Sequence, residues 1–251
     1  MKFSVVIGNP PYQAARDPEK LKGNTKTIWG DFVSLSNGLL EDDGALAYLH
    51  PAMYRKPGNK LQDIIYKNNR VLKIFNTADA TQVFGVSSRF DWYVVDKKYE
   101  GTTRVTFEDR TTREVQLDGI DFLPNGSMSI WAKAQSVAAR VGCIQTRNSR
   151  KTVRSPGDYK FVQTIVKKGV EYGTSYRLPE DYYTRKVIIS ETTGIALYDE
   201  GELGLSINCY MVAVESEEEG RTLVNFINSR LVRHLILSCR WGNFRVESCL
   251  F

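Results

Sequence analysis

Cysteine and histidine are scarce in this sequence of 251 residues, which contains four of the first and two of the second. The cysteines are scattered, and no Cys-x-x-Cys pair occurs. A zinc site or another transition-metal site is therefore not expected, and the thiols are predicted to be reduced. Scattered reduced thiols are typical of a cytoplasmic protein.

Long hydrophobic runs are absent as well. No stretch of 18 or more apolar residues occurs, so we expect no membrane span. The first eight residues are too short for a signal peptide and end abruptly at Asn9-Pro10-Pro11. Internal repeats and low-complexity tracts are missing too. These absences favour a folded cytoplasmic protein without a membrane partner.

The composition that remains is that of a globular protein, with 42% hydrophobic and 25% charged residues. It is sufficient for one large domain or two modest ones. The net charge of +5 and the pI near 8.9 permit a polyanionic partner without requiring one.

Positive charge is concentrated in residues 140–186, where eleven Lys and Arg residues face four Asp and Glu residues. Five tyrosines are interleaved with these charges, and cations mixed with flat rings are typical of a nucleic-acid groove. A solvated basic surface explains the composition equally well. The residues predicted to contact double-stranded DNA are Arg147, Arg150, Lys151, Arg154, Lys167, Lys168, Arg185 and Lys186.

The first hundred residues show strands alternating with helices. The apolar run Phe3–Ile7 predicts a strand that is buried on both faces, and apolar spacing predicts a helix over residues 29–40. Further strands are expected at residues 45–49, 71–75 and 90–95, with a helix at 61–66. This alternation predicts an α/β fold with a mostly parallel sheet.

The pattern changes after about residue 100. Hairpin strands are expected at residues 102–107 and 113–117, a helix at 131–141, and strands at 186–190 and 206–214. Ser216 and Glu219 have the spacing of a capping box that opens another helix. We therefore expect two domains, residues 1–100 and an α+β domain at residues 101–251.

The residues Gly8-Asn9-Pro10-Pro11-Tyr12 follow the first strand directly. Two prolines fix the backbone and remove two N–H donors, so a carbonyl and the Asn9 side-chain oxygen can accept hydrogen bonds from a ligand. Tyr12 supplies a flat face for stacking. At the carboxyl edge of an α/β sheet, where ligands bind, this corner predicts a pocket for the amino group of a planar base. A plain strand-ending turn is the alternative.

The segment Val6–Gln13 resembles the catalytic motif of adenine-specific DNA methyltransferases of the restriction-modification type. Similarity to this family continues at Asp31–Val33, Gly44–Pro51, Val83–Val86 and Phe90–Val95, and later at Arg185–Ile189 and Asn225–Val232. The resemblance implies a partial Rossmann-like methyltransferase sheet followed by a target-recognition domain. The first of these would be the catalytic half at residues 1–100.

The resemblance further implies base flipping, with S-adenosylmethionine as methyl donor. The extruded adenine would stack on Tyr12, and its amino group would donate hydrogen bonds to the Asn9 side chain and the Pro10 carbonyl. Phe90 would pack on the other face of the base, although core packing explains Phe90 as well.

The Gly-rich cofactor motif of the family is absent from the 251 residues. Without it, the strand Phe3–Ile7 would present an unpaired edge. Three remedies are open: a separate cofactor-binding subunit, a cover formed by a second copy or by later segments of the chain, or a longer enzyme of which these residues are a fragment. The expected function is that of an adenine-specific DNA methyltransferase subunit or fragment. The alternative is a non-catalytic, methyltransferase-like DNA-binding or anti-restriction protein.

Overall fold

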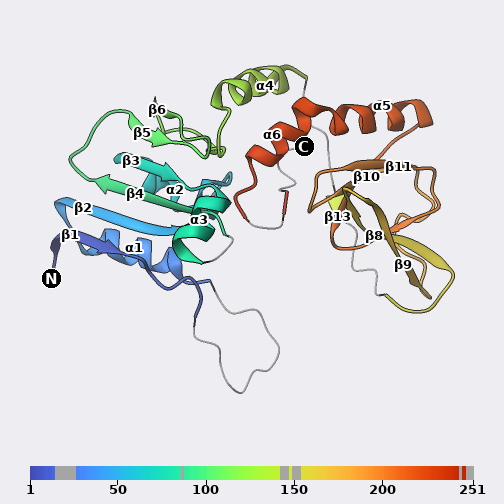
Figure 1. Cartoon of the computed structure of the whole chain (residues 1–251), viewed down its shortest axis with the longest axis horizontal. Helices are drawn as coiled ribbons and strands as arrows, with labels where there is room; N and C mark the ends of the chain where they lie inside the picture. The colour runs from blue at the N-terminus through green and yellow to red at the C-terminus, as the bar shows by residue number, and fades with distance from the viewer. Residues whose placement is uncertain (15–26, 86–87, 142–146, 149–153, 243–244, 247–251) are drawn as a thin grey trace. The chain divides into compact units, whose positions relative to one another are not determined.

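The computed structural model describes residues 1–14, 27–85, 88–141, 147–148, 154–242 and 245–246 (Figure 1). The chain divides into two compact units: the first comprises residues 1–126 with 241–243, and the second residues 127–240 with 244–251. The predicted boundary near residue 100 lies too early, because the two strands that follow it complete the sheet of the first unit.

The first unit is built on a six-stranded sheet with the order β1-β2-β4-β3-β5-β6. Its strands are β1 (Phe3–Gly8), β2 (Leu40–Pro51), β3 (Asn69–Ile74), β4 (Phe90–Asp96), β5 (Thr103–Thr106) and β6 (Thr112–Val115). The expected strands and the β5–β6 hairpin are confirmed. The expectation of a mostly parallel sheet is wrong. Only β1 and β2, and β3 and β5, pair in parallel, because β4 runs antiparallel to both of its neighbours.

One face of this sheet is covered by α1 (Trp29–Leu39). Alternate residues of β2 turn toward this helix: Leu46, Tyr48 and His50 are all buried. The Tyr48 hydroxyl is 2.6 Å from the hydroxyl of Ser36 on the helix, and the His50 ring stacks on Trp29 with centroids 4.5 Å apart. The remaining short helices of the unit are η1 (Ala52–Arg55), α2 (Gln62–Ile65) and α3 (Thr77–Phe84).

The strand β1 lies at the open edge of the sheet, with β2 on one side and no partner among the described residues on the other. Phe3, Val5 and Ile7 are 39%, 56% and 78% exposed. The prediction that this strand is buried on both faces is therefore wrong, because burial would require neighbours that the described residues do not provide.

A buried charged cluster in the first unit joins residues that are far apart in the sequence. Arg55 and Asp91 are both fully buried, and the Arg55 Nε atom is 2.7 Å from an Asp91 carboxylate oxygen. The guanidinium of Arg55 also donates to the Leu123 carbonyl at 3.1 Å. The indole N–H of Trp241, a residue near the end of the chain, donates to the same carbonyl at 2.7 Å. Late residues thus complete the core of the first unit.

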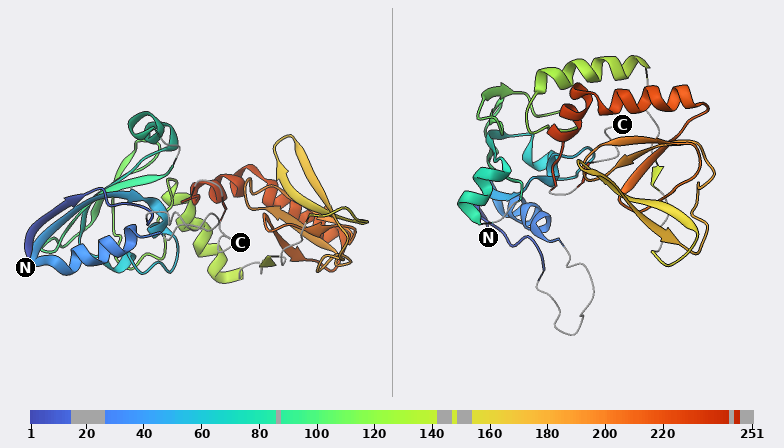
Figure 2. Two further views of the ribbon diagram at one scale, coloured as in Figure 1. Left: turned by 90° about the horizontal axis from the view of Figure 1, so that it is seen from below. Right: turned by 45° about the vertical axis from the view of Figure 1, so that its right-hand side comes forward.

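Within the described residues, the second unit contains two sheets and three helices. Figure 2 gives further views of the chain. The larger sheet has the order β11-β10-β13-β7 and the smaller one β12-β8-β9. The strands are β7 (Arg147–Asn148), β8 (Tyr159–Val166), β9 (Gly169–Ser175), β10 (Lys186–Ser190), β11 (Ala196–Asp199), β12 (Gly204–Leu205) and β13 (Cys209–Ala213); the helices are α4 (Met128–Val141), α5 (Glu217–Asn228) and α6 (Arg230–Ser238).

Strand β10 is the centre of the second unit, since all five of its residues are buried. Val187 and Ile189 pack into a cluster with Ile227 of α5 and Ile236 of α6. Ile188 points the opposite way, into a cluster formed with residues of both sheets. Helices, larger sheet and smaller sheet therefore form three layers around β10.

The capping box predicted at Ser216 is confirmed at the start of α5. The Ser216 side chain accepts a hydrogen bond from the Glu219 N–H at 3.1 Å, and the Glu219 carboxylate accepts from the Glu215 N–H at 2.8 Å. None of the helices within the described ranges combines the length and apolar character needed to span a bilayer.

Candidate active site

The corner Asn9–Tyr12 leaves the sheet where β1 ends. Gly8 pairs with Tyr48 near the end of β2, and a Cβ atom on Gly8 would lie only 3.1 Å from the Tyr48 ring. A residue without a side chain at position 8 thus lets the corner sit directly against the ring. Because β4 runs antiparallel to β2, its first residue Phe90 lies at this same end of the sheet.

The backbone at Tyr12 and Gln13 pairs with the residues just before α1. The Ile28 N–H donates to the Tyr12 carbonyl at 3.1 Å, and Gln13 forms a bridge with Thr27. These contacts bring the start of α1 back to the corner, so the position of Tyr12 does not depend on the corner alone.

The Tyr12 side chain contacts two of the other residues that the resemblance assigns to base capture, Asn9 and Phe90. Its hydroxyl donates a hydrogen bond to Asn9 Oδ1 at 2.6 Å, and its ring centroid is 5.5 Å from that of Phe90. Partial burial raises the pKa of the Tyr12 hydroxyl, whereas the hydrogen bond with Asn9 opposes this. The protonated hydroxyl therefore satisfies the oxygen of Asn9 in this structure.

The predicted base-capture residues differ in exposure. Asn9 is exposed, Tyr12 is half-buried, and Pro10 is buried with no hydrogen bond to its carbonyl from any other described residue. Phe90 is 3% exposed and also contacts Phe84, with ring centroids 5.4 Å apart. Stacking a base between Tyr12 and Phe90 requires about 7 Å between the rings, twice the usual carbon contact. The two rings would have to separate.

His50 is near the same end of the sheet but is fully buried. One ring nitrogen lies 2.9 Å from the Tyr93 hydroxyl and the other 2.9 Å from the Pro51 carbonyl. Burial lowers the pKa of His50 to about 4, so the ring is neutral at pH 7. Its contacts are those of a core residue.

The residues predicted to bind DNA lie in different surroundings. Lys167 and Lys168 form the exposed turn between β8 and β9, and Arg154 is exposed. Arg150 and Lys151 lie outside the described residues, and for Arg147 only the backbone pairing with Met211 is described. Lys186 is the first residue of β10, and Arg185 directly precedes it.

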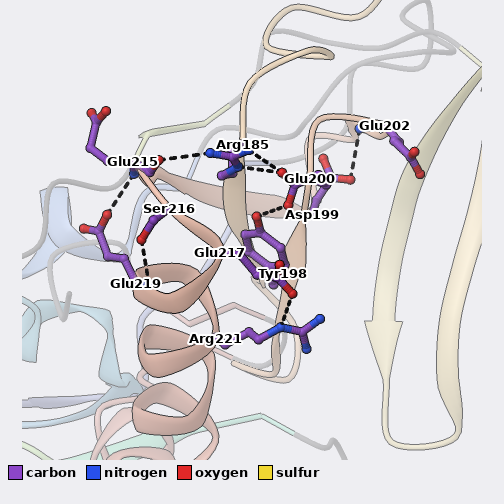
Figure 3. A network of polar contacts seen from close by, with 10 residues as sticks. All are labelled: Arg185, Tyr198, Asp199, Glu200, Glu202, Glu215, Ser216, Glu217, Glu219 and Arg221. Atoms are coloured by element: carbon purple, nitrogen blue, oxygen red, sulfur yellow. Dashed lines mark hydrogen bonds and ion pairs between the residues drawn. The ribbon is translucent and has the colours of Figure 1, made fainter.

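Arg185 is half-buried, and its guanidinium is engaged within the protein. Its Nε atom donates to Glu200 at 2.8 Å and another nitrogen donates to the Glu215 carbonyl at 3.0 Å (Figure 3). The neighbouring Glu200 raises the pKa of Arg185, and the Arg185 charge is balanced locally.

The structure corrects the prediction that Lys186 contacts DNA. Its side chain is fully buried and its ammonium is 2.5 Å from the Asp199 carboxylate. A phosphate cannot reach an ammonium that the protein encloses, so Lys186 is not a direct DNA contact. Buried lysines are rare unless paired, and the sequence carries no local signal that Asp199 is the partner.

Three of the tyrosines that the sequence interleaves with the basic segment are exposed in the second unit. Tyr172, Tyr176 and Tyr183 are 43%, 60% and 73% exposed. Lys160 Nζ lies 3.8 Å from the Tyr172 ring centroid, and the Arg177 guanidinium lies 5.3 Å from that of Tyr176. The basic segment therefore pairs cations with rings in space as well as in sequence.

Residues 1–84 match the model of the Eco57I restriction-modification methylase family. The similarity of the Asn-Pro-Pro-Tyr segment to restriction-modification methylases is thereby confirmed for this third of the chain. No curated protein matches the sequence.

Two solved restriction-modification enzymes resemble the chain over nearly its whole length. The Type IIL enzyme MmeI in complex with DNA has a TM-score of 0.60 at 8% identity, covering 97% of this chain and 45% of that one. The type IIG restriction endonuclease BpuSI has a TM-score of 0.42 at 12% identity, covering 98% and 46%. The chain shares the fold of the matched part of MmeI, and it spans less than half the length of either enzyme.

Proposed function

We propose that this chain performs base capture and DNA recognition in an adenine-specific DNA methyltransferase of a restriction-modification system. The observation that carries the proposal is the Asn9–Tyr12 corner at the end of β1, within the segment that matches the methylase family. An amide oxygen, a proline carbonyl and a tyrosine ring meet there, and these are the groups needed to hold an aminopurine.

The corner would act on an adenine that has left the duplex. Its amino group would donate one hydrogen bond to Asn9 Oδ1 and one to the Pro10 carbonyl, while its ring stacks on Tyr12. These two hydrogen bonds draw the amino nitrogen toward tetrahedral geometry and leave its lone pair available as a nucleophile. The methyl group would come from S-adenosylmethionine, the donor that the family implies.

Base capture requires a rearrangement of Tyr12. Because the Tyr12 hydroxyl now occupies Asn9 Oδ1, an incoming amino group would replace it as hydrogen-bond donor. The rotation that frees Asn9 would also move the Tyr12 ring away from Phe90.

The described residues of the first unit do not fit the cofactor. The corner contains two prolines, which lack the N–H donors of a Gly-rich cofactor turn. A cavity of about 310 Å³ in this unit is lined by Asp42 and Lys97, which lie at the other end of β2 and β4 from Asn9. We therefore assign S-adenosylmethionine binding to a polypeptide outside these residues, such as a separate subunit.

The second unit would hold the duplex through its exposed cations. Within the basic segment, the described candidates are Arg154, Lys167 and Lys168, together with the cation–ring pairs at Tyr172 and Tyr176. Each neutralised phosphate adds about 0.9 to the slope of the logarithm of affinity against the logarithm of salt concentration.

The test is binding of the full chain to labelled duplexes that carry one unpaired base, measured by fluorescence anisotropy. We expect tighter binding when that base is adenine than when it is purine, which lacks the amino group. Asn9→Ala should abolish this preference, which we expect to be about tenfold. Leu35→Ala, at an exposed position of α1, is the matched control and should keep it.

Tyr12→Phe separates the two roles of the tyrosine. The ring remains for stacking, and Asn9 loses its internal donor, so unpaired adenine should bind at least as tightly as in the wild type. Tyr12→Ala should weaken that binding by about tenfold through lost stacking.

Two outcomes would contradict the proposal in different parts. If Asn9→Ala leaves the adenine preference intact while DNA still binds, the corner does not capture the base, and a non-catalytic DNA-binding or anti-restriction protein explains the chain better. Tight binding of S-adenosylmethionine to the isolated chain in a calorimetric titration would overturn the assignment of the cofactor site to another polypeptide.

A further inference from the structure

The buried ammonium of Lys186 binds the backbone of a surface loop. Besides the Asp199 carboxylate, it donates to the carbonyls of Asp181 and Thr184, each at 2.9 Å. A third carbonyl, that of Tyr182, lies 3.4 Å away. An ammonium has three N–H donors, and these partners use all of them. Lys186 therefore fixes the path of residues 181–184.

Asp199 extends this arrangement to a second segment. Its carboxylate accepts a hydrogen bond from the backbone N–H of Glu202 at 3.2 Å (Figure 3). It also accepts one from the backbone N–H of Leu203 at 3.3 Å. Gly201, in the turn between Asp199 and Glu202, has a φ of +107°, and a Cβ atom there would lie 2.8 Å from the Tyr183 carbonyl. The turn 199–203 thus packs against the backbone of the loop, and the buried ion pair holds both.

The loop presents Tyr183, which is 73% exposed. Its ring contacts that of Tyr182 at 5.2 Å between centroids, and Tyr182 contacts Tyr159 of β8 at 5.4 Å. Tyr183 is thus backed by a row of rings that ends on a strand. A tyrosine held in this way loses little conformational entropy when it binds a partner.

Cation–ring pairs lie near the loop, together with the acidic residues Glu180, Glu200 and Glu202. The preceding residues include the exposed pair Arg177 and Tyr176, and β8 and β9 carry the pair Lys160 and Tyr172. Exposed rings beside cations suit a ligand with both flat bases and phosphates.

We propose that Tyr183 contacts the bases of duplex DNA, and that Lys186 and Asp199 are positioning residues that hold its loop for this contact. The inference rests on the proposed function and adds a contact residue and its support to the recognition unit. It also explains why a lysine in the basic segment is buried: its charge orders a loop instead of meeting a phosphate.

The first measurement is anisotropy titration of the full chain with a mixed-sequence duplex over a series of salt concentrations. Tyr183→Ala should weaken binding by about tenfold without changing the salt dependence, because a ring and not a charge is removed. Phe226→Ala on α5, where the ring is 56% exposed, is the matched control and should bind as the wild type does.

The second measurement tests whether Lys186 acts through Tyr183. The paired variant Lys186→Met with Asp199→Asn leaves no unpaired buried charge, and it should weaken binding without altering the salt slope. By contrast, Lys167→Met should lower that slope by about 0.9. Adding Tyr183→Ala to the paired variant should cost no further affinity, since the ring is already misplaced.

A second variant tests the same role in case the paired variant does not fold. Gly201→Ala leaves the ion pair in place but pushes a methyl group toward the Tyr183 carbonyl, and it should weaken DNA binding to a similar extent. An additive loss when Tyr183→Ala is added to the paired variant, or a changed salt slope in the paired variant, would overturn the positioning role.

The failures of the inference and of the proposed function are distinguishable. If the wild-type chain binds no duplex, both are overturned. If it binds and Tyr183→Ala binds equally well, only the contact proposed for Tyr183 is overturned.

Discussion

The hydroxyl of Tyr12 illustrates how one atom can decide the state of the candidate site. It satisfies the Asn9 oxygen in the absence of a base, so the acceptor is not left bare on the surface. The same contact fixes the Tyr12 ring against Phe90. A purine must then offer its own donor and stacking surface in exchange, which favours bases that carry an amino group.

At His50 the relevant property is the cost of charging a buried ring. The pKa of His50 is lowered to about 4 in the folded chain, against an ordinary value near 6.5 when unfolded. Between these values the unfolded state binds a proton that the folded state excludes. Stability is therefore lost as the pH falls from about 6.5 to about 4, by roughly 3 kcal/mol in all.

This pH dependence is tested by comparing the wild type with His50→Gln. Urea unfolding at several pH values should show that the free-energy difference between the two proteins changes by roughly 3 kcal/mol from pH 7 to pH 4. The change should favour the variant at the acidic end. Buried Asp91, whose pKa is raised by burial, is common to both proteins, so its titration largely cancels. A constant difference across the range would contradict the assignment.

At the scale of the element, β1 has an open edge next to an apolar face. Phe3, Val5 and Ile7 point to one side of the strand, and Trp92 of β4, 38% exposed, shares the face of the sheet that α1 does not cover. Unpaired backbone groups beside exposed apolar side chains favour pairing with another strand.

We therefore expect the isolated chain to self-associate through β1. Val5→Lys places a charge in the middle of the edge and should shift the chain toward the monomer in analytical ultracentrifugation at micromolar concentrations. Leu35→Lys on α1 introduces the same charge at a 58% exposed position and should leave the association unchanged. A wild-type chain that is monomeric throughout would show that the edge is not an interaction surface.

At the scale of the whole molecule, the first unit is not continuous in sequence. Trp241 follows the helices of the second unit in sequence, yet it belongs to the first. Its ring is 1% exposed and contacts Phe122 at 5.8 Å between centroids, and its N–H donates to the Leu123 carbonyl. The first unit thus needs residues from both ends of the chain.

Trp241→Ala should destabilise the first unit by about 3–5 kcal/mol, the usual cost of removing a large buried ring. Hydrogen exchange followed by mass spectrometry should then show faster exchange in β2 and β4. Exchange in β8 and β10 should change little, since those strands belong to the second unit. Equal acceleration in both units would mean that the chain unfolds as one cooperative body.

Local features could be predicted from the sequence because their causes lie within a few residues. The corner Asn9–Tyr12 follows from two prolines after a strand, and the start of α5 follows from the capping residues Ser216 and Glu219. The hairpin β8–β9 was missed, although two runs of β-forming residues around Lys167-Lys168-Gly169 are a hairpin signal.

What the sequence determined by itself was the chemistry on offer: an amide, a proline carbonyl and a ring at one corner, and a segment rich in cations and tyrosines. Only the tertiary structure decided which of these groups meet solvent. Lys186 and Lys167 are the same residue type in one basic segment, but a carboxylate 13 residues after Lys186 makes its burial tolerable. Likewise, β1 is apolar enough to be central and yet lies at an edge, because burial depends on neighbouring strands that local sequence does not specify.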